Sequence, residues 1–282
     1  MNEQKDYIVV PFPEIEDRFG LNIQDYSSGL FFSNNPTDSA VYENPSANTF
    51  AVYEGDTTMD ELDFTVLGHG LDQPQNRAIL VIGNLHINRH INLYGTDVGY
   101  PIGLYVTGNL TAEKVVMSSL SDIVVLGNIE VKKDCYAVNT ECGYIACGGN
   151  FSAANVYLES FGLTVKGNLN VSNFHYYVNL SREDIDTSLE ELSINIGNLG
   201  DTEPIAWGES GIKYFDLMED IENGDLDFDD LDESEMSKVD ALYKENFVFK
   251  PQHYSKHNEF DVSNKVYEAL LKGEDIFARI KT

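Results

Sequence analysis

The chain has 282 residues and a formal net charge of −29 at pH 7, with 47 acidic against 18 basic side chains. Such an excess of negative charge argues against nucleic acids and anionic membrane surfaces as direct ligands, because both are negatively charged themselves. Hydrophobic residues make up 42% of the sequence and aromatic residues 11%, which is enough for a packed core and excludes a wholly disordered chain.

The number of cysteines and the distribution of apolar residues indicate where in the cell the protein is located. The sequence has an odd number of cysteines, and their spacing does not match that of a metal-binding finger: Cys135, Cys142 and Cys147. The first residues lack the basic and apolar segments of a secretory signal, and no stretch approaches the ~18 continuous apolar residues of a membrane span. We therefore expect a soluble, cytoplasmic protein. Its acidity either serves solubility alone or matches a strongly basic partner.

Residues 1–76 precede the regular part of the chain and are rich in turn formers and aromatic side chains. Short alternating runs such as residues 49–53 are typical of β-strands. A stack of repeats exposes backbone groups and core side chains at its first unit unless another segment covers them. We interpret residues 1–76 as an N-terminal, β-rich cap.

Residues 77–199 contain five copies of a motif in which apolar residues alternate on both sides of a Gly-Asn pair. The first copy, Ile79–Ile87, is apolar at positions 79, 81, 85 and 87. The asparagines lie 25, 19, 22 and 18 residues apart, which is within the range of solenoid repeats. The five pairs are Gly83 and Asn84, Gly108 and Asn109, Gly127 and Asn128, Gly149 and Asn150, and Gly167 and Asn168.

The alternation predicts two short strands per repeat, each with one inward face, separated by a corner at Gly-Asn. Glycine and asparagine adopt positive φ most readily, and we expect the corner to require it. Apolar runs at residues 91–93, 115–117 and 156–158 predict a third strand in each coil. The predicted fold is mainly β: a parallel β-helix solenoid of about five coils.

Two patterns in this region leave alternatives open. Leu104–Asn109 fits the LxLxxN pattern of leucine-rich repeats, but the next apolar residues lie one and three positions after the asparagine, which favours the parallel β-helix. Ser193–Leu199 imitates a sixth copy with its apolar residues one position out of phase. It is either a degenerate final coil or a coincidence.

Residues 200–282 differ in composition from the repeats. Between Asp216 and Glu235, eleven of twenty residues are acidic and none is basic. From Asp261 to Ile280 the apolar residues follow helical spacing, which predicts an amphipathic helix. We expect this helix to pack on the solenoid.

The acidic run from Asp225 to Asp232 does not fit a calcium-binding EF-hand loop. With Asp225 at position one, Asp230 falls where glycine is needed and Met236 where the bidentate glutamate should lie. Apolar residues interleave with the acids, so the run is either a solvated loop or a segment that presents carboxylates to a basic partner. The candidate partner-binding residues are Asp225, Asp227, Phe228, Asp229, Asp230, Asp232 and Glu233.

No catalytic or metal-binding pattern emerges from the sequence. It lacks a G-x-S-x-G elbow, a phosphate-binding GxxxxGK[ST] loop and an HExxH helix. We interpret His86 and His90 as exposed histidines on strands and not as metal ligands. The outward repeat positions carry no stacked acids or arginines, but Leu80, Ile82, Val124 and Leu126 form an apolar strip that either a cap covers or a partner contacts. We expect no enzyme activity, cofactor, metal or small-molecule ligand.

The five copies resemble two sets of bacterial solenoids. One is the bactofilins, polymer-forming cytoskeletal β-helices with a Gly-polar corner between apolar strands. The other comprises acidic repeat proteins with V-x-G-[ND]-L-x-[AV] copies that occur as immunity partners of polymorphic toxins. The resemblance covers about 100 of 282 residues and involves structural positions only, so no functional residue is carried over.

The flanking segments distinguish the two resemblances. Bactofilins resemble a solenoid without long flanking segments, and the flat ends of that solenoid stack into filaments. This chain instead has about 76 residues before the repeats and about 90 after them. Capped ends and high net charge oppose self-association. The sequence therefore favours a non-enzymatic immunity protein that binds a basic toxin domain, such as a nuclease. The alternatives are a bactofilin-like scaffold and a carbohydrate-active β-helix enzyme.

Overall fold

The structure is a computed structural model with two compact units. The first comprises Met1–His175 and Leu189–Pro204, and the second comprises Tyr176–Ser188 and Ile205–Thr282. The structure describes residues 7–11, 14–21, 49–64, 76–94, 102–118, 121–138, 143–159, 161–177, 194–200, 204–205, 237, 241, 249, 252 and 259–276.

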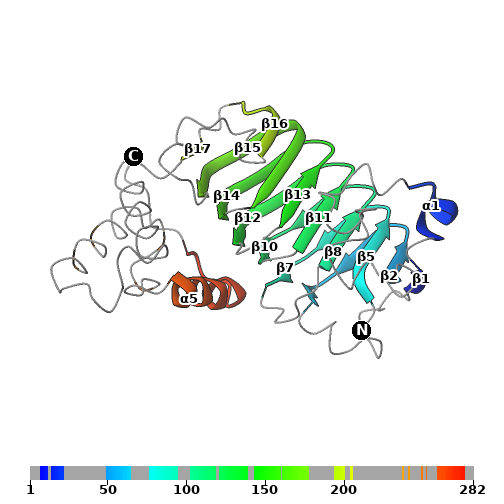
Figure 1. The fold of residues 1–282 in the computed structure, drawn as a ribbon, viewed down its shortest axis with the longest axis horizontal. Coiled ribbons are helices and arrows are strands. Elements are labelled where there is room, and N and C mark those ends of the chain that lie inside the picture. Colours follow the sequence, from blue (N-terminus) through cyan, green and yellow to red (C-terminus); the bar gives the residue numbers. More distant parts are fainter. Residues whose placement is uncertain are drawn as a thin grey trace, which may run out of the picture. The chain divides into compact units, whose positions relative to one another are not determined.

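The first unit is a parallel β-solenoid whose strands stack coil upon coil into three faces (Figure 1). The first face contains β2 (Thr49–Glu54), β5 (Asn76–Ile82), β8 (Ile102–Val106), β11 (Ser121–Val125), β13 (Tyr144–Cys147), the first part of β15 (Gly162–Tyr177) and β16 (Ile194–Asn198). The second face contains β3 (Thr57–Met59), β6 (Leu85–Ile87), β9 (Leu110–Ala112) and the first parts of β12 (Ile129–Val138) and β14 (Phe151–Glu159).

The third face contains β4 (Leu62–Asp63), β7 (His90–Leu93), β10 (Lys114–Met117) and the later parts of β12 and β14. Its strands confirm the third strand that the sequence predicts for each coil. The side chains on both sides of β7 and β10 are buried, as Val115 and Val116 in β10 illustrate. A short strand, β17 (Pro204–Ile205), also pairs with β15.

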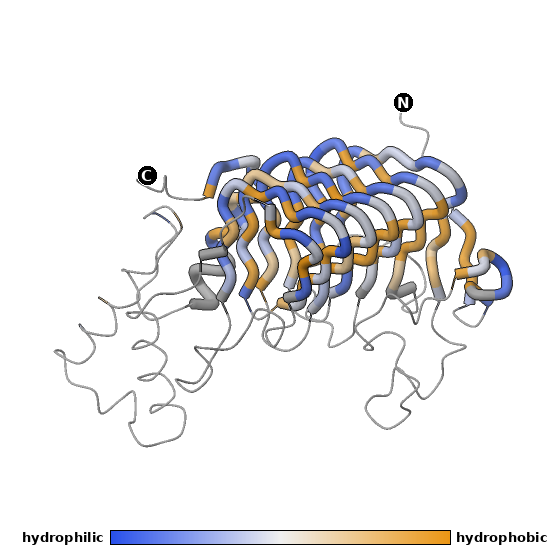
Figure 2. The backbone as a smooth tube through the Cα atoms, turned by 90° about the horizontal axis from the view of Figure 1, so that it is seen from above, coloured by the Kyte–Doolittle hydropathy of each residue, from blue (hydrophilic) through white to orange (hydrophobic). Residues whose placement is uncertain are grey.

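Each copy of the motif lies on its own coil, with the Gly-Asn pair between the first and second faces. All twenty apolar motif positions are buried, at 8% exposure or less. Cys147 is among them, at a position where other copies have valine. Residues of similar hydropathy line up from coil to coil as continuous bands (Figure 2). The leucine-rich alternative is wrong, because the residues after each asparagine begin a second strand.

A further coil precedes the five copies, inside the segment that the sequence analysis interprets as a cap. Strands β2, β3 and β4 pair in parallel with β5, β6 and β7, and Tyr53 aligns with Val81. Gly55 and Asp56 occupy the corner that Gly-Asn occupies elsewhere. The cover itself consists of β1 (Ile8–Pro11), which pairs antiparallel with β2, and helix α1 (Glu14–Phe19).

Positive φ accounts for the corner glycines only in part. Among the corner glycines of the five copies, only Gly83 has a positive φ, of 142°. At the others the constraint is close approach between coils. A Cβ atom on Gly127 would lie 2.6 Å from both the Gly108 carbonyl oxygen and Asn109 Oδ1. Glycine is therefore required because successive corners nearly touch.

The corner asparagines form a directional ladder of hydrogen bonds. The Asn109 backbone N–H and Nδ2 both donate to Asn84 Oδ1, at 2.8 and 3.1 Å. Asn128 donates to Asn109 Oδ1 in the same way, at 2.8 and 3.0 Å. The ladder starts at Asp56, whose Oδ1 accepts from Asn84 at 2.9 Å. It ends at Asn198, whose Oδ1 accepts from the Gly200 N–H at 3.0 Å.

The sixth, imperfect copy is a degenerate final coil. Strand β16 pairs in parallel with β15, so that Leu163 aligns with Ile194 and Asn168 with Asn198. A register shift in this pairing absorbs the residue that the copy lacks before its glycine. Asn198 Nδ2 still donates to Asn168 Oδ1, at 2.8 Å. The shift explains why the apolar pattern is one position out of phase.

The second unit contains helix α5 (Glu259–Leu271), which confirms the predicted C-terminal helix. Val266, Ala269 and Leu270 are buried, in agreement with an amphipathic pattern. Lys272 pairs with Glu268 at 3.1 Å on the exposed side. That this helix packs on the solenoid stays a prediction.

Replacing Asn109 with alanine tests the ladder. We expect Asn109→Ala to lower the free energy of unfolding by about 1–2 kcal/mol, because the backbone N–H of Asn128 loses its acceptor. Urea denaturation monitored by circular dichroism measures the change. Asn170→Ala, an exposed strand asparagine, is the matched control and should leave the midpoint nearly unchanged. Equal effects of the two substitutions would contradict a stabilising role for the ladder.

Candidate functional site

The outer side of the first face is apolar over its early coils and is covered by the N-terminal arm, which we define as the described residues between 7 and 21. Val10 of β1 and Ile15 of α1 are fully buried in one cluster with outward residues of the face. Those outward residues are Phe50, Val52, Ala78, Leu80, Tyr105 and Val124. Of the two alternatives for the apolar strip, the arm therefore provides the first, a cover.

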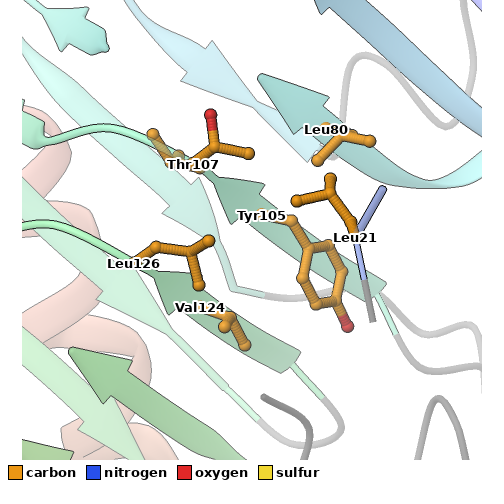
Figure 3. Close-up of a pocket in the computed structure, with 7 residues that line it drawn as sticks. Leu21, Leu80, Tyr105, Thr107, Val124 and Leu126 are labelled. Carbon is orange, nitrogen blue, oxygen red and sulfur yellow. The ribbon is translucent and has the colours of Figure 1, made fainter. Parts of the chain in front are cut away.

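At the edge of the arm, the described residues leave a hollow beside Leu21 (Figure 3). Leu21 of the arm lies across Leu80 and Tyr105, with Val124 of β11 and Leu126 just after that strand next to them. Ile82, another residue of the predicted strip, is only half-buried. The described residues that line the hollow are Leu21, Leu80, Tyr105, Val106, Thr107, Val124 and Leu126, and among them Tyr105 and Thr107 carry a side-chain oxygen.

Asp122 lies on the same outer side, two residues before Val124 in β11. Its side chain is 1% exposed, and neither carboxylate oxygen has a hydrogen-bond partner. Burial raises the pKa of the Asp122 carboxyl from 3.8 to about 7, because a charged carboxylate loses its hydration there. A buried carboxyl whose oxygens lack a hydrogen-bond partner is unusual, so Asp122 is a candidate functional residue.

Sequence reasoning misses Asp122 because a carboxylate at an outward strand position normally faces water. The signal that identifies it is its row of neighbours. Gly103 and Tyr144 flank Asp122 on the adjacent strands, and the ring of Tyr105 leans back over Gly103. A glycine beside an aromatic residue two positions later leaves room for the ring to lie flat along the strand.

A second group of polar side chains lies in a column where the second face turns into the third. Lys114 Nζ lies 3.8 Å from Asp134 Oδ2, and both side chains are 5% exposed. Asn155 Nδ2 donates to Asp134 Oδ1 at 2.8 Å, which extends the column by one coil. A lysine, an aspartate and an asparagine thus follow one another along the stack and interact from coil to coil, which favours this register of the coils.

His90 occupies the first position of this column, next to Lys114. Its Nε2 lies 3.9 Å from Glu61 Oε2. Burial is the main influence on His90 and lowers its pKa, and Glu61 opposes that effect. The sequence predicts an exposed histidine here, and this prediction is wrong, because His90 is only 8% exposed. His86 is half-buried on the second face.

The candidate partner-binding residues all lie outside the described residues. They are Asp225, Asp227, Phe228, Asp229, Asp230, Asp232 and Glu233. Their binding role stays a prediction. Within the described part of the chain, no three histidine, cysteine or acidic side chains are grouped so that they could hold a metal ion. Cys135 and Cys147 are buried there and form no disulfide.

Breaking the buried ion pair tests the column. We expect Lys114→Met to lower the free energy of unfolding by roughly 3 kcal/mol, because Asp134 would remain buried without its counter-charge. Adding Asp134→Asn should recover most of the loss, since the amide keeps an acceptor for Asn155. Urea denaturation of the two variants measures both effects.

Lys133→Met is the matched control, because Lys133 pairs with Glu113 at the same corner but is half-exposed. Its effect should be much smaller than that of Lys114→Met, as water screens the exposed pair. A Lys114→Met variant as stable as the wild type would show that apolar packing alone sets the register.

No family model matches the sequence, and neither a curated protein nor a solved structure is significantly similar to the chain. Among the described helices, none is both long and apolar enough to cross a membrane. What this chain has in common with a known architecture is its parallel β-solenoid fold.

Proposed function

We propose that this chain is a non-enzymatic binding protein of the cytoplasm whose partner is a basic protein. In its most specific form it is an immunity protein that covers a basic toxin domain with carboxylates. The observation that carries the proposal is the net charge of −29 on a chain with a large packed solenoid. A folded surface with this excess of carboxylates attracts basic proteins over long range and repels acidic ones.

The ends of the solenoid support this proposal over the bactofilin-like alternative. Filaments of stacked solenoids need a free strand edge at each end. Here β1 pairs antiparallel with β2 on the edge that a parallel copy would use. At the other end of the asparagine ladder, Asn198 Oδ1 already accepts from the Gly200 N–H. Both features oppose the addition of further coils from another molecule.

A pull-down with the full chain as bait tests the proposal, using the product of the adjacent gene as the first candidate partner. We expect a basic protein to bind at low ionic strength. Its affinity should fall at least roughly tenfold between 0.1 and 0.5 M salt, because the charges that attract the two proteins become screened. A candidate that does not bind, or binds independently of salt, would contradict the proposal.

A pair of substitutions in β1 tests the role of the arm as an end cover. Val10→Asp places a carboxylate in the fully buried cluster beneath the arm and should detach it. The edge of β2 would then be free, and we expect the variant to self-associate in size-exclusion chromatography. Val9→Asp is the matched control, since Val9 is 51% exposed, and it should elute like the wild type.

Electron microscopy of the wild-type protein tests the scaffold alternative directly. Filaments of the wild-type protein would favour the scaffold alternative and contradict the interpretation of β1 as a cover. A Val10→Asp variant that stays dispersed in solution would show that charge alone prevents stacking.

A further inference from the structure

The last strand of the first face, β16, ends the solenoid with an edge that the described residues leave open. Among them, only β15 pairs with β16, whereas β1 covers the corresponding edge of β2 at the opposite end of the stack (Figure 1). Asn195, Gly197 and Asn198 are exposed, although every residue of the interior strand β11 is buried. The two ends of the solenoid therefore differ.

The direction of the backbone hydrogen bonds shows which groups this edge presents. In the interior coils, the carbonyl of the last inward residue before the corner accepts a hydrogen bond from the following coil. The donor N–H and acceptor carbonyl pairs are Thr107 to Val81 at 3.0 Å, Leu126 to Val106 at 2.9 Å and Gly148 to Val125 at 2.8 Å. Ile196 aligns with Val165 and so occupies this place in the last coil. Because the N–H and C=O of one residue in a parallel strand point to the same side, both groups of Ile196 face away from β15.

The apolar core also ends openly at β16. Ile196 and Leu199 lie in inward columns but are only half-buried, whereas Val165, the preceding member of the Ile196 column, is 1% exposed. The asparagine ladder, in contrast, is already closed, because Asn198 Oδ1 accepts from the Gly200 N–H. A further Gly-Asn coil therefore finds no acceptor at the corner, but a single added strand finds a backbone edge and an apolar margin.

The sequence around β16 is strongly acidic. Between residues 183 and 212 it has eight acidic residues and no basic one. On the neighbouring strand β15, Lys166 is an exposed basic side chain. The excess of negative charge around β16 therefore favours a strand that carries lysine or arginine over an acidic strand.

We propose that the edge of β16 is the docking site for an extended segment of the basic partner, which adds to the first face as one more strand. This inference rests on the proposed function and names the surface through which the chain would act. Main-chain hydrogen bonds to Ile196 give such an addition its affinity, and apolar side chains that alternate along the added strand cover Ile196 and Leu199. Lysine or arginine side chains of the segment meet the acidic surroundings.

Two other occupants of the edge give different outcomes in the tests. A second copy of the chain, paired through the two β16 edges, would bring two stretches of the same negative charge together, which is unfavourable. A segment of the same chain would cover the edge already in the free protein.

Amide hydrogen exchange of the free chain at low concentration tests whether the edge is open. We expect the Ile196 N–H to exchange at least roughly 100-fold faster than that of Val125, which occupies the same place in an interior coil. Equal protection in the dilute protein would assign the edge to a segment of the same chain and overturn the proposal. Protection of Ile196 that appears only as the concentration rises would assign the edge to a second copy and overturn it too.

Substitution of Ile196 tests the docking site in the complex with the product of the adjacent gene. Ile196→Pro removes the N–H that faces the added strand and none that faces β15, and we expect it to weaken binding roughly tenfold in calorimetry. Ile196→Val keeps the N–H and is the matched control, with an affinity within about twofold of the wild type. Equal affinities of all three proteins would overturn the docking site and leave the proposed function standing. A wild type that does not bind would contradict the proposed function itself, and the docking site with it.

Hydrogen exchange with and without the same partner keeps the proposal testable if Ile196→Pro does not fold. In the complex, we expect the Ile196 N–H to exchange at least roughly tenfold more slowly than in the free chain. The N–H of Val9 in β1 should not change, because Pro11 lacks a donor and blunts that edge. Slower exchange at Val9 with no change at Ile196 would place the partner at the opposite end of the solenoid and overturn the proposal.

Discussion

The distance between neighbouring coils at the Gly-Asn corner is the constraint on which the rest of the solenoid depends. Parallel strands on the flat faces fix one spacing between coils, and the corner must match it while the chain changes direction. Glycine permits the match, because even one carbon atom more on Gly127 would collide with the preceding corner. Asparagine then uses the short distance, since its amide donates to the coil before it and accepts from the coil after it.

The fold could be predicted from the sequence because this constraint repeats. Five Gly-Asn pairs in register with alternating apolar residues specify corners, strand directions and an inward ladder, and the structure confirms each. The physical reason for glycine was predicted only in part. Positive φ is a property of an isolated turn, and it applies to Gly83. The other corners need glycine for proximity, which is a property of the stack and is invisible in a single copy.

The features that the sequence did not reveal lie at positions that deviate from the Gly-Asn repeat pattern. The first coil has Gly55-Asp56 at its corner and a threonine, Thr57, after it, so it does not match the motif, although Asp56 starts the hydrogen-bond ladder as a natural acceptor. Asp122 occupies an outward position, where an acid is unremarkable until the arm is in place above its neighbours. The burial of an outward side chain cannot be inferred from local periodicity. The acidic segment at residues 225–233 stays a sequence-level hypothesis.

The direction of the asparagine ladder bears on how such a chain can change length over generations. Every interior coil offers the same donor to its predecessor and the same acceptor to its successor, so interior coils are interchangeable in their hydrogen bonding. The terminal positions are not, because Asp56 supplies only an acceptor and Gly200 supplies only a donor. Duplication or loss of a whole coil is therefore tolerable in the middle of the array, whereas the two ends must be inherited intact.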